Sequence, residues 1–147
     1  MAHVKLFSRT GIDGAPEVQD SIHKSLGLLP ETYSAMGRSG AFLRSMLNLD
    51  QAAGNNLEEK TRQLIAIAVS AANGCSYCLH AHRALALKAG CVEEDVTGAL
   101  EIAAMMSAYN TFNKATGLSH DVTPESLGVK TSIDHNGSYG SSNLTRI

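Results

Sequence analysis

The run Leu64–Ala72 constrains the fold of this chain more than any other segment. Its nine residues include no charged side chain and are apolar on nearly every side. Such a run could also form a buried strand, but its length and its alanine content favour a central, buried helix. A helix of this kind needs packing partners on all sides, so the rest of the chain or a neighbouring subunit must supply them.

Glycines and prolines divide the remaining sequence into further helices. Gly54, Gly74, Gly90 and Gly117 each follow an apolar run, as expected for residues that end a helix in the left-handed conformation. No stretch alternates with a period of two for long enough to predict a sheet. We therefore expect an all-α helical bundle of about six helices. They are Pro16–Leu26, Pro30–Met36, one around Phe42, Leu43, Met46 and Leu47, one containing Leu64–Ala72, one ending near Ala89, and one from Glu93 towards Ala115.

Two local details follow from the same patterns. Asn56 is expected to cap the helix that contains Leu64–Ala72, with Glu59 three residues later as its capping partner. Met105 and Met106 lie in an apolar helix and are expected to be core residues.

The chain divides at about residue 118. Residues 1–118 carry the helical pattern, whereas residues 119–147 are rich in Ser, Gly, Asn and Thr and have few large apolar side chains. Such a segment cannot bury much surface. We expect it to be a flexible tail or an extension that packs on a neighbouring subunit.

Composition excludes several classes of partner. A net charge of -2 and a pI near 6.3 argue against binding to nucleic acid or to an anionic membrane surface. No apolar run approaches the roughly 18–20 residues that span a bilayer. The first residues lack the pattern of a signal peptide, and three cysteines do not make a secreted disulfide framework. The expected location is the cytoplasm.

The segment from Cys75 to His82 predicts redox chemistry. In a helix, Cys75, Cys78 and His82 fall along one face, with Cys78 one turn from His82. Gly74 ends the preceding helix, so both thiols lie in the first turn of the next, where free N–H groups stabilise a thiolate. The pattern indicates a redox-active dithiol with its own base.

The order in which the two thiols react stays open. We expect Cys78 to attack and Cys75 to resolve the adduct, but the opposite order is common in CxxC oxidoreductases. A zinc site and an inert buried pair are the alternatives to a redox pair. Without a second CxxC we expect no metal, and nothing in the sequence predicts a cofactor. Cys91 is expected to be structural and His80 to lie at the surface.

The sequence resembles the carboxymuconolactone decarboxylase/alkylhydroperoxidase AhpD superfamily. The resemblance rests on Leu57–His82, with Asn-Gly-Cys-x-Tyr-Cys-x-x-Ala-His as its specific core, and covers about Ala15–Gly117. It implies an all-α fold, a homo-oligomer such as a hexamer or trimer, and thiol-dependent reduction of peroxides or disulfides. It also implies that Cys75 and Cys78 are the redox pair and that His82 relays protons. The decarboxylases of this superfamily lack the cysteine pair.

Two positions depart from the family pattern. Gln63 stands where the family usually has a glutamate, and an amide can orient a histidine but cannot take its proton. Glu59, one turn earlier, could replace that glutamate or could simply stabilise the start of its helix. Tyr77 stands where AhpD has another histidine, and it is expected mainly to pack. We therefore expect a slow peroxidase or a competent disulfide reductase.

Three functional classes are consistent with these residues. The first is a thiol oxidoreductase that acts on hydroperoxides or protein disulfides and takes electrons from a thiol donor. The second is a decarboxylase-like acid/base enzyme, in which the cysteine pair would be idle. The third is a non-enzymatic redox sensor or scaffold, in which the disulfide changes conformation or partner binding.

Overall fold

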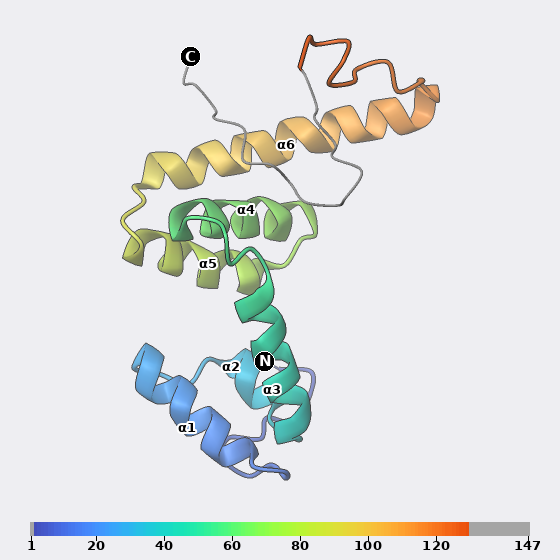
Figure 1. The fold of residues 1–147 in the computed structure, drawn as a ribbon. Coiled ribbons are helices and arrows are strands. Elements are labelled where there is room, and N and C mark those ends of the chain that lie inside the picture. Colours follow the sequence, from blue (N-terminus) through green and yellow to red (C-terminus); the bar gives the residue numbers. More distant parts are fainter. Residues whose placement is uncertain (1, 130–147) are drawn as a thin grey trace, which may run out of the picture.

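Six α-helices make up the fold in the computed structural model, which describes residues 2–129 (Figure 1). They are α1 (Ala15–Leu26), α2 (Glu31–Met36), α3 (Gly40–Ala52), α4 (Glu59–Ala72), α5 (Ser76–Lys88) and α6 (Glu93–Thr116). Between residues 2 and 129 there is no strand, only an isolated bridge between Ile12 and Ser39. The predicted all-α fold of about six helices is confirmed.

The helix ends follow the predicted glycines, with one correction at the start of α4. Gly74 and Gly117 have φ values of 71° and 61°, in the left-handed region that ends a helix. Asn56, by contrast, does not cap α4, and the prediction of a capping box there was wrong. The N-cap residue is Glu58, and its side chain makes no capping hydrogen bond. Asn56 lies instead in a turn closed by a hydrogen bond from the N–H of Leu57 to the carbonyl of Gly54.

The helices form two groups. In the first, α3 packs against α1 and α2; in the second, α4 packs against α5 on one side and α6 on the other. Figure 1 shows the two groups one below the other, joined by the segment between α3 and α4. The core of the second group consists of Ile67, Ala86, Cys91, Val96 and Ala99. These residues fix α5, which carries the cysteine pair, against α4.

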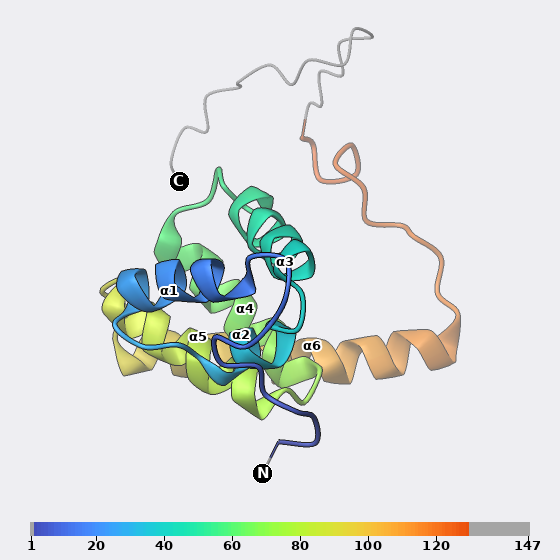
Figure 2. The same cartoon turned by 90° about the horizontal axis from the view of Figure 1, so that it is seen from below.

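Helix α4 is less buried than its sequence predicts. Ile65 and Val69 are 50% and 53% exposed, because α5 and α6 cover only part of the helix surface. The methionines Met105 and Met106 are also half-exposed, so the prediction that they are core residues was wrong. The physical reason is that only the N-terminal half of α6 lies on α4. Its C-terminal half runs beyond the other helices in two perpendicular views (Figures 1 and 2).

Buried hydrogen bonds hold the first group together. The fully buried Gln19 of α1 donates from Nε2 to the carbonyls of Phe7 and Tyr33, and its Oε1 accepts from the N–H of Arg9. Gly37 leaves room for this side chain, because a Cβ there would lie 2.0 Å from Gln19 Nε2. These contacts tie α2, which contains Tyr33, to α1 and to the segment before it.

The remaining sequence predictions concern the membrane and the tail. In the part of the chain that the structure describes, no helix is both long and apolar enough to cross a membrane. Helix α6 ends at Thr116, and the segment that follows it forms no helix up to residue 129. Most of the predicted tail 119–147 lies outside the described residues, so its role stays a prediction.

Candidate functional site

The cysteine pair lies where α4 gives way to α5. Gly74, in the left-handed region, reverses the chain, and the N–H of Cys75 donates to the carbonyl of Ser70 at the end of α4. Cys75 is the N-cap residue of α5, and Cys78 is its third helical residue. The two cysteines form a disulfide with their Cα atoms 5.3 Å apart. Both thiols are thus in the first turn, as the sequence predicts.

The start of α5 favours negative charge on these sulfurs. Both cysteines are half-buried, and the N–H of Cys78 points at Cys75 Sγ with a separation of 3.2 Å. Backbone N–H groups in the first turn of a helix have no partner within the helix, and the helix dipole is positive at this end. A reduced thiol here is therefore easier to ionise than a free cysteine.

His82 lies one turn after Cys78 on α5 and is held by α4. Its Nδ1 atom is 2.7 Å from Oε1 of Gln63, a residue that is almost fully buried. Gln63 in turn donates from Nε2 to Oε1 of Glu59 at 2.6 Å. The structure thus brings together three of the predicted site residues in one chain of hydrogen bonds. The amide of Gln63 stands between the carboxylate of Glu59 and the imidazole.

Arg62 links this chain of hydrogen bonds to the end of α3. Its guanidinium donates from Nη2 to both the carbonyl and Oδ1 of Asp50 at 2.7 Å, and from Nε to the carbonyl of Ala53 at 3.3 Å. Its Nη1 lies 3.8 Å from Oε2 of Glu59. Sequence reasoning assigned no role to Arg62 or Asp50. The only sequence signal for Arg62 is its opposite charge three residues after Glu59 on the same helix face.

The surroundings keep His82 neutral over a wider pH range than an ordinary histidine. Burial lowers the pKa of His82; the Asp50 carboxylate opposes this shift, the Arg62 guanidinium adds to it, and the Glu59 carboxylate opposes it. The net pKa lies below the ordinary value of about 6.5. A neutral imidazole at physiological pH can accept a proton from a nearby thiol.

A hydrogen bond links helix α2 to a residue between the two cysteines. The N–H of Thr32 donates to the hydroxyl of Tyr77, which lies between the two cysteines in sequence, at 3.2 Å. Burial raises the pKa of Tyr33, and the Asp50 carboxylate and Tyr77 add to this shift, so its hydroxyl stays protonated. Tyr77 is nearly half-exposed and bonds to α2, which is more than the packing role that the sequence predicts.

The other cysteine and histidine of this region stay apart from the site. Cys91 is a free cysteine buried in the core of the second helix group, as expected for a structural residue. His80 is exposed, and its Nδ1 lies 2.8 Å from the carbonyl of Ser76 on its own helix. Within residues 2–129, no group of three or more His, Cys, Asp or Glu side chains is arranged to hold a metal ion.

Comparison with known proteins finds two proteins of similar sequence. An alkyl hydroperoxide reductase AhpD from Streptomyces avermitilis is 35% identical over 69 residues, and the chain spans only 39% of that protein's length. Uncharacterized protein 4 in the cox locus of Paracoccus denitrificans is 31% identical over an alignment of 103 residues, and the match covers 64% of this chain and 93% of that protein.

The fold also matches a solved structure. The crystal structure of the alkylhydroperoxidase AhpD core from Rhodospirillum rubrum superposes with a TM-score of 0.71 and 25% sequence identity. The match covers 88% of this chain and 99% of the other. Residues 40–121, more than half of the chain, match the carboxymuconolactone decarboxylase family. The chain therefore belongs to the carboxymuconolactone decarboxylase family, within the AhpD-like superfamily, and carries the CxxC pair Cys75–Cys78.

Proposed function

We propose that this protein is a thiol-dependent oxidoreductase that reduces hydroperoxides or protein disulfides through Cys75 and Cys78. One observation supports this most strongly. The two cysteines form a disulfide in the first turn of α5, one turn before a histidine that is hydrogen-bonded to Gln63. The sequence similarity of this protein to one named alkyl hydroperoxide reductase adds support for a peroxide substrate.

The peroxidase cycle begins with the reduced dithiol. His82 takes the proton of the Cys78 thiol, and the thiolate attacks the terminal oxygen of a hydroperoxide, so that the O–O bond breaks. The sulfur becomes a sulfenic acid, and the alkoxide receives the proton from His82 and leaves as an alcohol. The Cys75 thiol then attacks the Cys78 sulfur, its proton leaves with the hydroxyl as water, and the disulfide forms. A dithiol donor returns two electrons and two protons.

The disulfide-reductase cycle uses the same residues. The Cys78 thiolate attacks one sulfur of a substrate disulfide and releases the other as a thiol. Cys75 then attacks the mixed disulfide, which frees the second substrate thiol and forms the Cys75–Cys78 bridge. The substrate gains two electrons and two protons, and the cysteine pair loses them.

Either cysteine could be the one that attacks the substrate. Cys78 is our choice of attacking thiol because His82 lies one turn away. Cys75 is the second candidate, because its sulfur faces the N–H of Cys78 and its negative charge would be stabilised there. The two orders differ in which single cysteine variant still forms a covalent adduct with substrate.

The experiment that tests the function measures peroxide consumption and insulin disulfide reduction with dithiothreitol as donor. Wild type is compared with Cys78→Ser, Cys75→Ser and, as a matched control, Cys91→Ser. We expect both CxxC variants to lose turnover and Cys91→Ser to keep it. Cys75→Ser should still form a sulfenic acid or a mixed disulfide if Cys78 attacks. Activity that survives Cys78→Ser and Cys75→Ser alike contradicts the proposal, because the electrons then do not pass through this pair; no activity in wild type also contradicts it and favours an acid/base enzyme or a redox sensor.

We also propose that the protein forms a homo-oligomer through a surface made by α4 and α6, here called the α4/α6 face. Half-exposed or more exposed apolar side chains lie along it: Ile65, Val69, Ile102, Met105, Tyr109 and Phe112. The four α6 residues recur at helical spacing and form one stripe. Two residues of this face, Ile65 and Ile102, line a groove together with Leu64 and Gly98.

The extent and position of this face favour a second copy of the chain as its occupant. Side chains of this size leave on the order of several hundred Å² of apolar surface uncovered. Each partner in a stable complex contributes about 800 Å². The projecting half of α6 is continuous with the groove, so two copies can cover each other's faces at once, as a two-fold interface requires. This arrangement supplies the packing on α4 that its apolar sequence demands.

A further inference from the structure

The hydrogen-bond chain from Glu59 to His82 fixes the direction in which each group points. A carboxylate offers only acceptor atoms, so the NH₂ group of Gln63 must face Oε1 of Glu59, 2.6 Å away. The carbonyl oxygen of the same amide then faces the imidazole, 2.7 Å from Nδ1. A carbonyl also only accepts, so Nδ1 must carry the ring proton.

This arrangement leaves the other ring nitrogen as the base. In a neutral imidazole only one nitrogen is protonated, so a hydrogen on Nδ1 leaves the lone pair on Nε2. Among the described residues, no protein group hydrogen-bonds to Nε2 of His82. Nε2 is therefore the ring nitrogen that can accept a proton from a group outside the hydrogen-bond chain of Glu59, Gln63 and His82.

We propose that Glu59, held by Arg62, is a positioning residue that sets the orientation of the Gln63 amide and thereby the tautomer of His82. Without a carboxylate on its far side, the Gln63 amide can turn over and present its NH₂ group to Nδ1. The ring would then carry its hydrogen on Nε2 and could not act as a base there. The catalytic consequence rests on the proposed function, whereas the tautomer itself does not.

Arg62 is needed because Glu59 lies at the surface. The Glu59 side chain is 57% exposed, and an exposed glutamate samples many rotamers unless something holds it. Arg62 faces its second oxygen, Oε2, at 3.8 Å, while Oε1 binds Gln63. The guanidinium is itself fixed by the end of α3, through Asp50 and Ala53. The orientation of the imidazole thus depends on contacts of three helices, α3, α4 and α5.

The charged groups around His82 allow positioning to be separated from simple electrostatics. Glu59 and Asp50 raise the pKa of His82, and Arg62 lowers it. Removing Glu59 should therefore lower this pKa, and removing Arg62 should raise it. If the two residues act by positioning, however, both substitutions should change the tautomer in the same direction.

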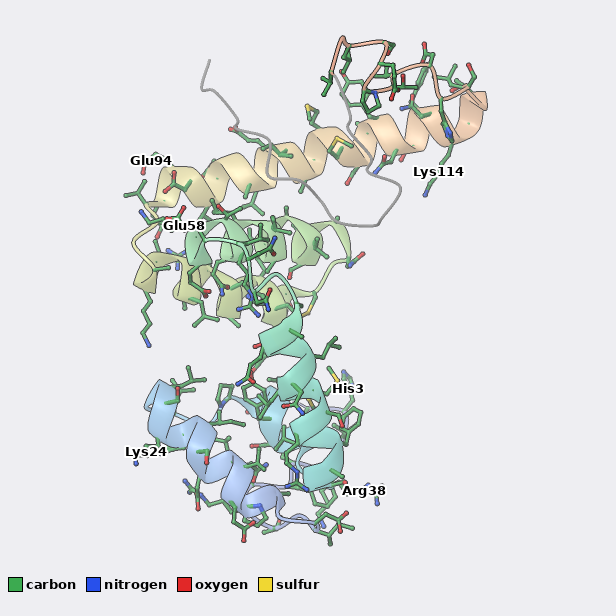
Figure 3. The ribbon with its side chains drawn as sticks, in the orientation of Figure 1. His3, Lys24, Arg38, Glu58, Glu94 and Lys114 are labelled. Carbon is green, nitrogen blue, oxygen red and sulfur yellow. A yellow bond between two sulfur atoms is a disulfide. The ribbon has the colours of Figure 1, made fainter. Side chains whose placement is uncertain are left out.

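The test uses the oxidised protein, labelled with ¹⁵N in its histidines, at about pH 8, where the ring is neutral. Two-bond ¹H–¹⁵N correlation spectra report which ring nitrogen of His82 is protonated, and the loss of its signals in His82→Gln assigns them. The variants are Glu59→Met and Arg62→Met, with Arg62→Lys as the conservative change. Glu58→Met is the matched control, because Glu58 is one residue away at the start of α4 and its side chain makes no cap (Figure 3).

We expect His82 in wild type and in Glu58→Met to be protonated on Nδ1. In Glu59→Met and Arg62→Met, we expect a severalfold rise in the Nε2-protonated form, with Arg62→Lys in between. Glu59→Met changes an exposed side chain and should fold even if Arg62→Met does not. A wild-type ring protonated on Nε2, or a tautomer that Glu59→Met leaves unchanged, overturns the proposal. Neither result depends on turnover, so failure here is distinct from failure of the proposed oxidoreductase function.

Discussion

The imidazole of His82 is oriented by the amide of Gln63, with Nδ1 and Oε1 2.7 Å apart, and not directly by a carboxylate. The nearest acidic group in this chain of hydrogen bonds, Glu59, lies one side chain further out. The amide transmits orientation between the two groups, but it does not readily take up or release a proton itself.

The first prediction concerns Gln63 and Glu59, the two side chains that lead to His82 in this chain of hydrogen bonds. We expect Gln63→Glu to raise peroxidase turnover by about ten- to hundred-fold, because a carboxylate beside Nδ1 can accept its proton. Alone, this change also puts a second carboxylate against Glu59, and the two must share a proton. The double variant Glu59→Gln/Gln63→Glu avoids that contact and should keep the gain. Steady-state rates and melting temperatures are measured together, and a folded double variant no faster than wild type would refute the relay argument.

The second prediction concerns pH. Burial keeps the pKa of His82 below its ordinary value of about 6.5, so the imidazole is neutral at neutral pH. In the proposed cycle, this neutral form takes the proton of the thiol. We expect the rate of peroxide reduction to fall about tenfold for each pH unit below the pKa of His82, and this acidic limb to be absent in His82→Gln. This pH dependence is measured by stopped-flow oxidation of the reduced protein from about pH 4 to about pH 8. An acidic limb that His82→Gln leaves in place assigns the titration to another group.

The same shift has a consequence for stability. The unfolded chain has the higher histidine pKa, so it binds more protons than the folded protein just below about pH 6.5. The stability that neutral His82 contributes is therefore present above that pH and is lost as the pH falls. Urea unfolding at several pH values should show a steeper loss in wild type than in His82→Gln.

The third prediction concerns oxidation of the three cysteines. We expect peroxide to convert Cys75 and Cys78 reversibly into their disulfide, while Cys91 stays reduced, because Cys91 is buried in the core. Mass spectrometry after alkylation with and without dithiothreitol identifies the oxidised residues. If Cys91 is instead the main oxidised residue of the folded protein, the assignment of Cys75 and Cys78 as the redox pair is refuted.

The fourth prediction tests the α4/α6 face. We expect wild type to be an oligomer by light scattering at micromolar concentration, with a hexamer or a trimer as the first expectation from the family. Ile102→Glu puts a charge into this face and should lower the mass to that of smaller species. Ala104→Glu is the control, because it adds the same charge two residues later on the opposite side of α6. Wild type that is monomeric, or both variants equally affected, contradicts the proposed interface.

The fifth prediction concerns the buried amide of Gln19. Gln19→Leu leaves the carbonyls of Phe7 and Tyr33 without their hydrogen-bond donor and should cost about 3 kcal/mol of unfolding free energy. Gln51→Leu makes the same change at an exposed position of α3 and should cost less than about 0.5 kcal/mol. Denaturant unfolding compares the two. Equal effects would mean that the Gln19 hydrogen bonds contribute little.

The sequence determined the local features of this protein. Helices, their glycine ends, and the placement of Cys75 and Cys78 in the first turn of α5 all follow from residues close together in the chain, because helical hydrogen bonds and caps are local. The family resemblance, carried by the segment around the cysteine pair, is confirmed by the family match and by the solved AhpD core.

Only the tertiary structure decided which side chains meet and which surfaces stay open. Gln63 and His82 are 19 residues apart and come together only because α4 packs against α5. Arg62 reaches the end of α3 because the connection between α3 and α4 folds back and brings Asp50 within 2.7 Å of its guanidinium, and no sequence spacing reveals that contact. The apolar pattern of α4 and α6 predicted burial, but an apolar side chain can be covered by its own chain or by another copy, and the pattern is the same in both cases. Met105 and Met106 were misassigned to the core because the position of α6 on α4, which leaves its second half projecting, is a property of packing and not of local sequence.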